Sequence, residues 1–220
     1  MDKNRINIKK ITTIALFCAL AYVVEFVFRI KVGFLTFDAK DAIITIEAMF
    51  FGPVSGLVTA IVVALIEMLT VSDTGLYGFV MNVASTVAFA VVASAIYKHK
   101  KTLKGAILGL LTGIISMSAV MVGMNLLVTP LYMKADISAV LKIIPTMILP
   151  FNFTKALFNT ALVLILYKPI SVALKRIGVA GDKNEKYSFD KTTIIMLISG
   201  IVTLTVALVI FIVVLNGKIV

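Results

Sequence analysis

Residues 143–167 read IIPTMILPFNFTKALFNTALVLILY, a mostly apolar run interrupted by a few polar side chains. A spanning helix needs about 20 such residues, so this run is long enough to cross a bilayer. Lys155 lies roughly 18 Å into it at 1.5 Å per residue, close to mid-membrane. Asn152, Lys155 and Asn159 share one helical face through their i, i+3 and i+7 spacing. Because a charge at the bilayer centre costs at least about 2.5–3.5 kcal/mol, we expect this face to line a cavity.

The rest of the chain has the same apolar character. Of its 220 residues, 60% are hydrophobic and 15% are charged, whereas soluble domains average about 45–50% and 25%. The apolar runs are 11–28, 42–51, 53–69, 76–97, 105–131, 143–167 and 192–215. We therefore predict an all-α integral membrane protein, in which the second and third runs form a short re-crossing around Gly52-Pro53.

The charge of the chain predicts its orientation. Twenty-one basic residues against eleven acidic ones give a net charge of +10. The basic residues cluster in segments 3–10, 98–104 and 168–191. Because cytoplasmic loops are enriched in Lys and Arg, we place the N-terminus and these segments in the cytoplasm, and we predict no nucleic-acid partner.

The composition also limits the chemistry. One cysteine, Cys18, and one histidine, His99, exclude an internal disulfide, a thiolate cluster and a multi-histidine metal site. No span carries a nucleophile next to a histidine base. We therefore predict no metal, no cofactor and no enzymatic activity.

The carboxylates near the spans have structural interpretations. Asp38 and Asp41 precede the second run and are interpreted as helix caps. Glu25 and Glu67 are placed near outer helix ends that water reaches, and the deeper Glu47 is a candidate counter-ion of the mid-membrane lysine.

Small residues recur every four positions on two runs. Gly105, Gly109 and Gly113 do so on the fifth run, and Ala15 and Ala19 on the first. This spacing lets helix backbones approach closely. For the glycines we expect packing within the chain.

Several short segments, taken in order, carry a family resemblance. They are DAKD at 38–41, FFGP at 50–53, VSDTG at 71–75, MN at 81–82, TPLYM at 129–133 and LPFN at 149–152 with Lys155 and Asn159. Their order and spacing over about residues 8–178 resemble the substrate-binding S components of energy-coupling-factor (ECF) vitamin transporters, and among them the riboflavin-specific, RibU-type members. The resemblance implies a compact six-helix bundle with an outward-facing vitamin pocket, covered by the loop after the first helix. It also implies a transmembrane T component and two cytoplasmic ATPases as partners.

The resemblance assigns roles to particular residues. It implies docking of the T component on the alanine-x-x-x-alanine pattern of Ala15 and Ala19. The implied flavin contacts are Asn125, Asn152 and Lys155, with Thr36, Phe37, Asp73, Gly75 and Asn82 as further candidates.

Flavin chemistry agrees with the polar face of the sixth run. The pyrimidine edge of an isoalloxazine has two carbonyl acceptors and one N–H donor, whereas its dimethylbenzene end is apolar. Asparagine both donates and accepts, and lysine only donates, so together they match this edge. No Arg or Lys cluster suited to a phosphate accompanies them, which favours uncharged riboflavin as a transported substrate.

The predicted organisation has three parts. Residues 1–178 form a membrane-embedded substrate-binding domain, 179–191 a cytoplasmic linker, and 192–220 an extra C-terminal transmembrane segment and tail that departs from the six-helix pattern. The predicted function is a riboflavin-binding S component in the cell membrane. The alternatives are an S component for another vitamin, a self-sufficient carrier, and an intramembrane enzyme acting on lipid or peptide.

Overall fold

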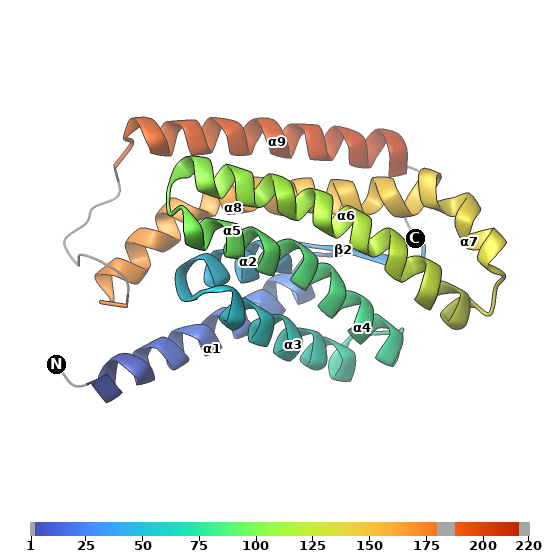
Figure 1. Ribbon diagram of the computed structural model, residues 1–220, viewed down its shortest axis with the longest axis horizontal. Helices are drawn as coiled ribbons and strands as arrows, with labels where there is room; N and C mark the ends of the chain where they lie inside the picture. Colours follow the sequence, from blue (N-terminus) through green and yellow to red (C-terminus); the bar gives the residue numbers. More distant parts are fainter. Residues whose placement is uncertain (1–2, 180–187, 216–220) are drawn as a thin grey trace.

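The structure is a computed structural model that describes residues 3–179 and 188–215 (Figure 1). Helices dominate it, and a short hairpin follows the first helix. In chain order the elements are α1 (Lys3–Val27), β1 (Arg29–Val32), β2 (Leu35–Asp38), α2 (Lys40–Phe51), α3 (Pro53–Thr70), α4 (Gly75–Thr86), the π-helical turn η1 (Val87–Val91), α5 (Val92–His99), α6 (Leu103–Met133), α7 (Ile137–Ile143), the π-helical turn η2 (Ile144–Ile148), α8 (Leu149–Arg176) and α9 (Lys191–Leu215).

Six helical segments of the described chain are long and apolar enough to cross a membrane. They are 8–27, 53–70, 75–99, 103–133, 137–176 and 191–214. Helix α2 has 12 residues and is largely buried, and at 1.5 Å per residue it reaches about 18 Å, less than the roughly 30 Å hydrocarbon core. The predicted all-α membrane bundle is confirmed, with α2 as an inner helix beside the spans.

Strands β1 and β2 form an antiparallel hairpin between α1 and α2. Gly33 in its turn has φ +60°, a left-handed conformation that suits glycine. Since side chains alternate along a strand, Leu35 and Phe37 face an apolar cluster shared with α8 and α9. Thr36 lies on the opposite face and lines a cavity.

The glycines of α6 pack within the chain, as predicted. A Cβ on Gly109 would lie 2.5 Å from the carbonyl oxygen of Ala93, and one on Gly113 would lie 3.0 Å from that of Phe89. A Cβ on Gly105 would overlap the loop before α6. The repeat therefore allows α6 to approach α5 and η1 at backbone distance.

The extra helix predicted over 192–215 is α9, which lies along α8 (Figure 1). Gly200 permits the close approach, since a Cβ there would lie 3.2 Å from the carbonyl oxygen of Ala161. Asp190 starts the helix by accepting a 3.1 Å hydrogen bond from the N–H of Thr193. Much of the predicted linker, residues 180–187, and the tail, residues 216–220, lie outside the described residues.

A buried ion network corrects the prediction that Glu25 and Glu67 lie at water-accessible helix ends. Both carboxylates are buried, and so is Lys40. The Nζ atom of Lys40 lies 2.9 Å from Oε1 of Glu25 and 2.7 Å from Oε2 of Glu67. The hairpin folds the start of α2 back into the bundle, where an unpaired lysine would be strongly unfavourable.

Two other carboxylates also differ from their predicted roles. Glu47 is hydrogen-bonded to Ser55 and is not the counter-ion of the mid-membrane lysine. Asp41 does not cap α2: it lies in the first turn of that helix, and its Oδ1 accepts a 2.6 Å hydrogen bond from Thr86 on α4. Asp38 does accept a 3.3 Å bond from the N–H at the start of α2, but its other oxygen serves the ion pair described below.

Candidate ligand-binding site

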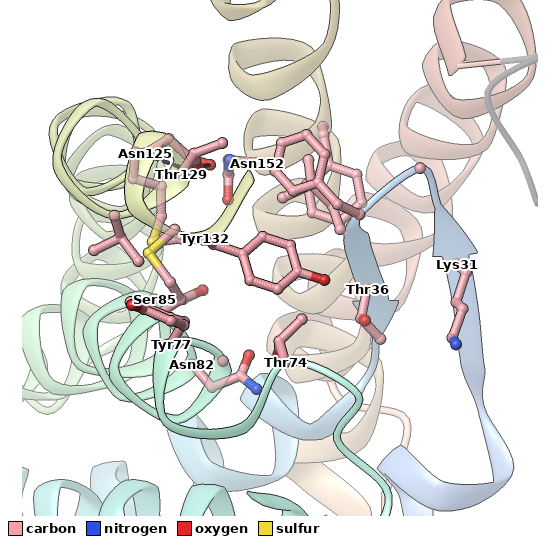
Figure 2. Close-up of a pocket in the computed structure, with 18 of the residues that line it drawn as sticks. Lys31, Thr36, Thr74, Tyr77, Asn82, Ser85, Asn125, Thr129, Tyr132 and Asn152 are labelled. Carbon is pink, nitrogen blue, oxygen red and sulfur yellow. Dashed lines mark hydrogen bonds between the residues drawn. The ribbon is translucent and has the colours of Figure 1, made fainter. Parts of the chain in front are cut away.

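A cavity of about 300 Å³ opens at one end of the bundle (Figure 2). Its walls come from the β1–β2 hairpin, the last turn of α3, the loop before α4, α4 itself, the second half of α6 and the first turns of α8. These segments lie far apart in the sequence. The volume is at the lower end of the range of about 300–1,000 Å³ typical of small-molecule sites.

The polar end of the cavity is formed by α6 and α8. Nδ2 of Asn125 donates to the carbonyl of Met121 (2.7 Å), and its Oδ1 accepts from Thr129 (2.8 Å). Nδ2 of Asn152 donates to the carbonyl of Ile148 (2.8 Å). Each side-chain amide thus donates one N–H to a backbone carbonyl one turn earlier and has a second N–H left. Within the described chain, the side-chain oxygen of Asn152, Oδ1, accepts no hydrogen bond. Figure 2 shows these side chains grouped on one side of the cavity.

Lys155 lies beside the two amides, and its charge is already neutralised. Its Nζ lies 2.6 Å from Oδ2 of Asp38 and 3.3 Å from the carbonyl oxygen of Thr36. Because an ammonium has three N–H groups, one remains for the cavity. Asn159, predicted on the same face, is used differently: it donates to the carbonyl of Asp38 and accepts from the N–H of Ala42. It holds α2 and the hairpin to α8 and does not line the cavity.

The outer rim joins the hairpin to the loop before α4. Lys31 on β1 pairs with Asp73 in that loop, and both side chains are half-exposed or more. The hydrogen bond and charge of Lys31 lower the pKa of Asp73. On the same side, Asn82 of α4 donates to Oε2 of Glu67 at 2.6 Å and so connects the cavity wall to the buried network. An exposed ion pair contributes little stability, so this contact of the rim is weakly held, whereas Arg29 at the base of β1 donates a partly buried hydrogen bond to the carbonyl of Val71 in the same loop.

Two tyrosines, Tyr77 on α4 and Tyr132 on α6, also line the cavity. Neither was among the ligand contacts predicted from the sequence. Their rings make an edge contact with centroids 6.1 Å apart. The other apolar and aromatic residues of the lining are Phe34, Leu35, Met81, Met121, Val128 and Phe151. The sequence carried a partial signal for these tyrosines, since Tyr132 falls inside TPLYM and Tyr77 lies two residues after the end of VSDTG.

The structure brings most of the predicted ligand contacts to this cavity, but not Phe37 and Gly75. Phe37 is buried on the other face of β2, where it packs against Phe151, Phe158 and Phe211. Gly75 has φ +53° and starts α4, so its role is in the turn. The predicted residues that do line the cavity are Thr36, Asp73, Asn82, Asn125, Asn152 and Lys155.

Ala15 and Ala19 lie away from the cavity, on α1. Both are exposed on the surface of the bundle, and their i, i+4 spacing puts them on one face of the helix. The glycines of α6 are covered by α5 and η1, whereas this pair leaves a flat strip of helix open to another protein or to lipid.

A multi-span bundle with a partly polar cavity at one end is a membrane-embedded small-molecule binding protein. Residues 9–167 match the family described as the ECF transporter, substrate-specific component, and the chain belongs to that family. It is 34% identical over 180 residues to the riboflavin transporter RibU of Staphylococcus aureus (strain TCH60), covering 77% of this chain and 94% of that protein. It also resembles the solved S component of a bacterial ECF transporter, with a TM-score of 0.67 and 31% identity over 77% of this chain and 99% of the other.

Proposed function

We propose that this chain is a riboflavin-binding S component, which captures the vitamin outside the cell and releases it inside when docked to a T component and two ATPases. One observation carries the proposal: Asn125, Asn152 and Lys155 converge on one end of a cavity that also has aromatic and apolar walls and a polar rim. The relative named a riboflavin transporter supports the same ligand.

The donors and acceptors suit the pyrimidine edge of a flavin. The spare N–H and the carbonyl of Asn152 match a carbonyl and the ring N–H of the flavin, and the third N–H of Lys155 matches the second carbonyl. The rings of Tyr77 and Tyr132 suit a flat heterocycle. Thr36 and Asn82, nearer the rim, offer partners for the hydroxyls of the ribityl chain.

The charges of the lining favour a neutral ligand. Each cation that lines the cavity has a carboxylate nearby: Lys155 has Asp38, Lys31 has Asp73, and Arg29 lies 4.0 Å from Glu67. A phosphate would have to break these pairs or remain without a cation, at a cost in either case. We therefore propose uncharged riboflavin, bound as the transported substrate and not as a resident cofactor.

The remaining parts of the proposal concern topology and partners. The N-terminus is cytoplasmic, the cavity opens outward, and the protein resides in the cell membrane. The exposed strip of Ala15 and Ala19 docks the T component. Binding alone does not drive uptake, because the energy comes from ATP hydrolysed on the partner subunits.

Titration of the purified protein in detergent with riboflavin tests the ligand. We expect saturable quenching of flavin fluorescence at micromolar riboflavin, and weaker binding of flavin mononucleotide. No quenching would contradict the proposal. Displacement of riboflavin by excess folate, biotin, thiamine or pantothenate would favour an S component for another vitamin, and uptake into vesicles by the chain alone would favour a self-sufficient carrier.

A further inference from the structure

Helix α9 lies beyond the family match, which ends at residue 167, yet it contacts the hairpin beside the cavity. Near its end, the ring of Phe211 lies 4.9 Å from that of Phe37 on β2, at an angle of 57°. Ala207, one turn earlier, is 1% exposed and shares an apolar cluster with Val32 and Leu35 of the hairpin. The last turns of α9 therefore touch the hairpin as well as α8.

These contacts belong to a single stripe of α9. The stripe begins in the first half of α9, where the bundle covers Thr193, Met196 and Gly200. Ala207 and Phe211 continue the same face of the helix, at helical spacing. The other side of α9 is not covered by the bundle: the side chains of Val209 and Ile212 are 54% and 60% exposed. The aromatic residue of this stripe, Phe211, lies at the point where the stripe reaches β2.

Strand β2 transmits this contact to the cavity. Phe37 faces α9 from one side of the strand, and Thr36, its neighbour, lines the cavity from the other. The carbonyl of Thr36 also accepts a hydrogen bond from Lys155. A shift of Phe37 therefore moves the backbone that shapes the cavity wall.

The opposite edge of the hairpin is held more loosely near its turn than at its base. At the base, Arg29 of β1 donates a hydrogen bond to the carbonyl of Val71 in the loop before α4. Nearer the turn, the side-chain attachment to that loop is the exposed ion pair of Lys31 and Asp73, which water and salt weaken. The base and the apolar side, which is buried against α8 and α9, are thus the anchored parts about which the turn of the hairpin opens.

We propose that α9 clamps the hairpin over the cavity and that Phe211 is the positioning residue of this clamp, slowing exchange of the ligand. The ligand in question is that of the proposed function, but the clamping of the hairpin does not depend on which ligand binds. A stacked or tilted aromatic pair adds to the stabilisation from buried area. We expect its loss to raise the ligand dissociation rate roughly three- to tenfold, where tenfold corresponds to about 1.4 kcal/mol.

The test compares Phe211→Ala with Ile212→Ala in the full-length protein. Ile212 is the next residue on α9 and is 60% exposed, so it controls for the loss of apolar side-chain atoms. Hydrogen exchange of the hairpin amides, measured without vitamin, is expected to be faster in Phe211→Ala and unchanged in Ile212→Ala. Phe211→Tyr, which keeps the ring, is expected to restore slow exchange. A general loss of stability in Phe211→Ala would instead speed exchange throughout the bundle and not at the hairpin alone.

Stopped-flow recovery of flavin fluorescence then measures riboflavin release from the same variants. Faster release from Phe211→Ala alone supports the clamp, and equal hairpin exchange in the Ala variants overturns it. If the wild type binds no riboflavin, the proposed function fails, while the exchange measurement still decides the clamp. If Phe211→Ala does not fold, Phe211→Leu, which keeps apolar volume without the ring, is measured in its place.

Discussion

The buried pair of Lys155 and Asp38 makes a quantitative prediction about stability. Replacing Lys155 with methionine keeps a long side chain but removes the ammonium 2.6 Å from the Asp38 carboxylate, which is itself fully buried. The next cation, Lys40, lies 3.9 Å from that carboxylate and is already shared with Glu25 and Glu67. Lys155→Met therefore leaves a buried carboxylate without its main partner.

Removing one partner of a buried pair costs about 3–5 kcal/mol. At about 2–4 °C per kcal/mol for a chain of this size, the Tm falls by roughly 6–20 °C. Asp38→Asn, which leaves the ammonium unpaired, is expected to cost a similar amount. The double variant, Lys155→Met with Asp38→Asn, removes both charges and should recover most of the loss.

Thermal unfolding in detergent, without vitamin, measures these values. The chain has no tryptophan, so far-ultraviolet circular dichroism of the helices is the suitable signal. The reasoning is refuted if each single variant costs less than about 1 kcal/mol, or if the double variant costs the sum of the two, since coupled sites are not additive.

The double variant also separates folding from binding. Because it is expected to fold well, its riboflavin affinity reports the contact between Lys155 and the ligand. A hydrogen bond to a charged group contributes about 1.5–3 kcal/mol, so affinity should fall roughly 10- to 150-fold. Wild-type affinity in a stable double variant would mean that Lys155 is only structural.

Three other predictions follow from the same contacts. Asn152→Ala is expected to weaken riboflavin binding about tenfold or less, the cost of a neutral hydrogen bond, without changing the Tm by more than a few degrees; unchanged affinity would remove this residue from the site. Gly109→Ala places a methyl group 2.5 Å from a carbonyl oxygen and should cost about 1–3 kcal/mol in thermal unfolding, whereas Gly123→Ala, with nothing within 4 Å, should not destabilise. The double variant Ala15→Phe with Ala19→Phe should preserve riboflavin binding but abolish uptake in cells. Intact uptake would contradict docking of the T component at this strip.

Local sequence was sufficient for the membrane bundle. The apolar runs, the Gly-Pro break after α2 and the glycine repeat of α6 act over one helix or one turn, so hydropathy and spacing predict them. The clustering of amides and lysine was also visible, because residues three and four apart share a helical face. The spacing alone therefore predicts that Asn152 and Lys155 share a site.

Partner choice could not be predicted in the same way. Asn159 continues the same face of α8, yet it binds the backbone of α2 because the hairpin and α2 pack one turn deeper than the cavity. Phe37 and Thr36 are adjacent in the sequence, and the alternation of β2 sends one into the apolar cluster and the other into the cavity. The family resemblance implies a loop over this segment, and a loop has no alternation of faces from which the two side chains could be told apart.

The sequence by itself determined that this protein is a polytopic helical bundle, which family it resembles, and which helix presents amides and an ammonium at mid-membrane. The tertiary structure alone decided which carboxylate neutralises which lysine. Lys155 and Asp38 are 117 residues apart, and Lys40 and Glu67 are 27 apart. A buried charge is tolerated only where such a distant partner lies beside it. The position of the hairpin determines which partners lie together, and that position depends on α3, α8 and α9, which all pack around the hairpin.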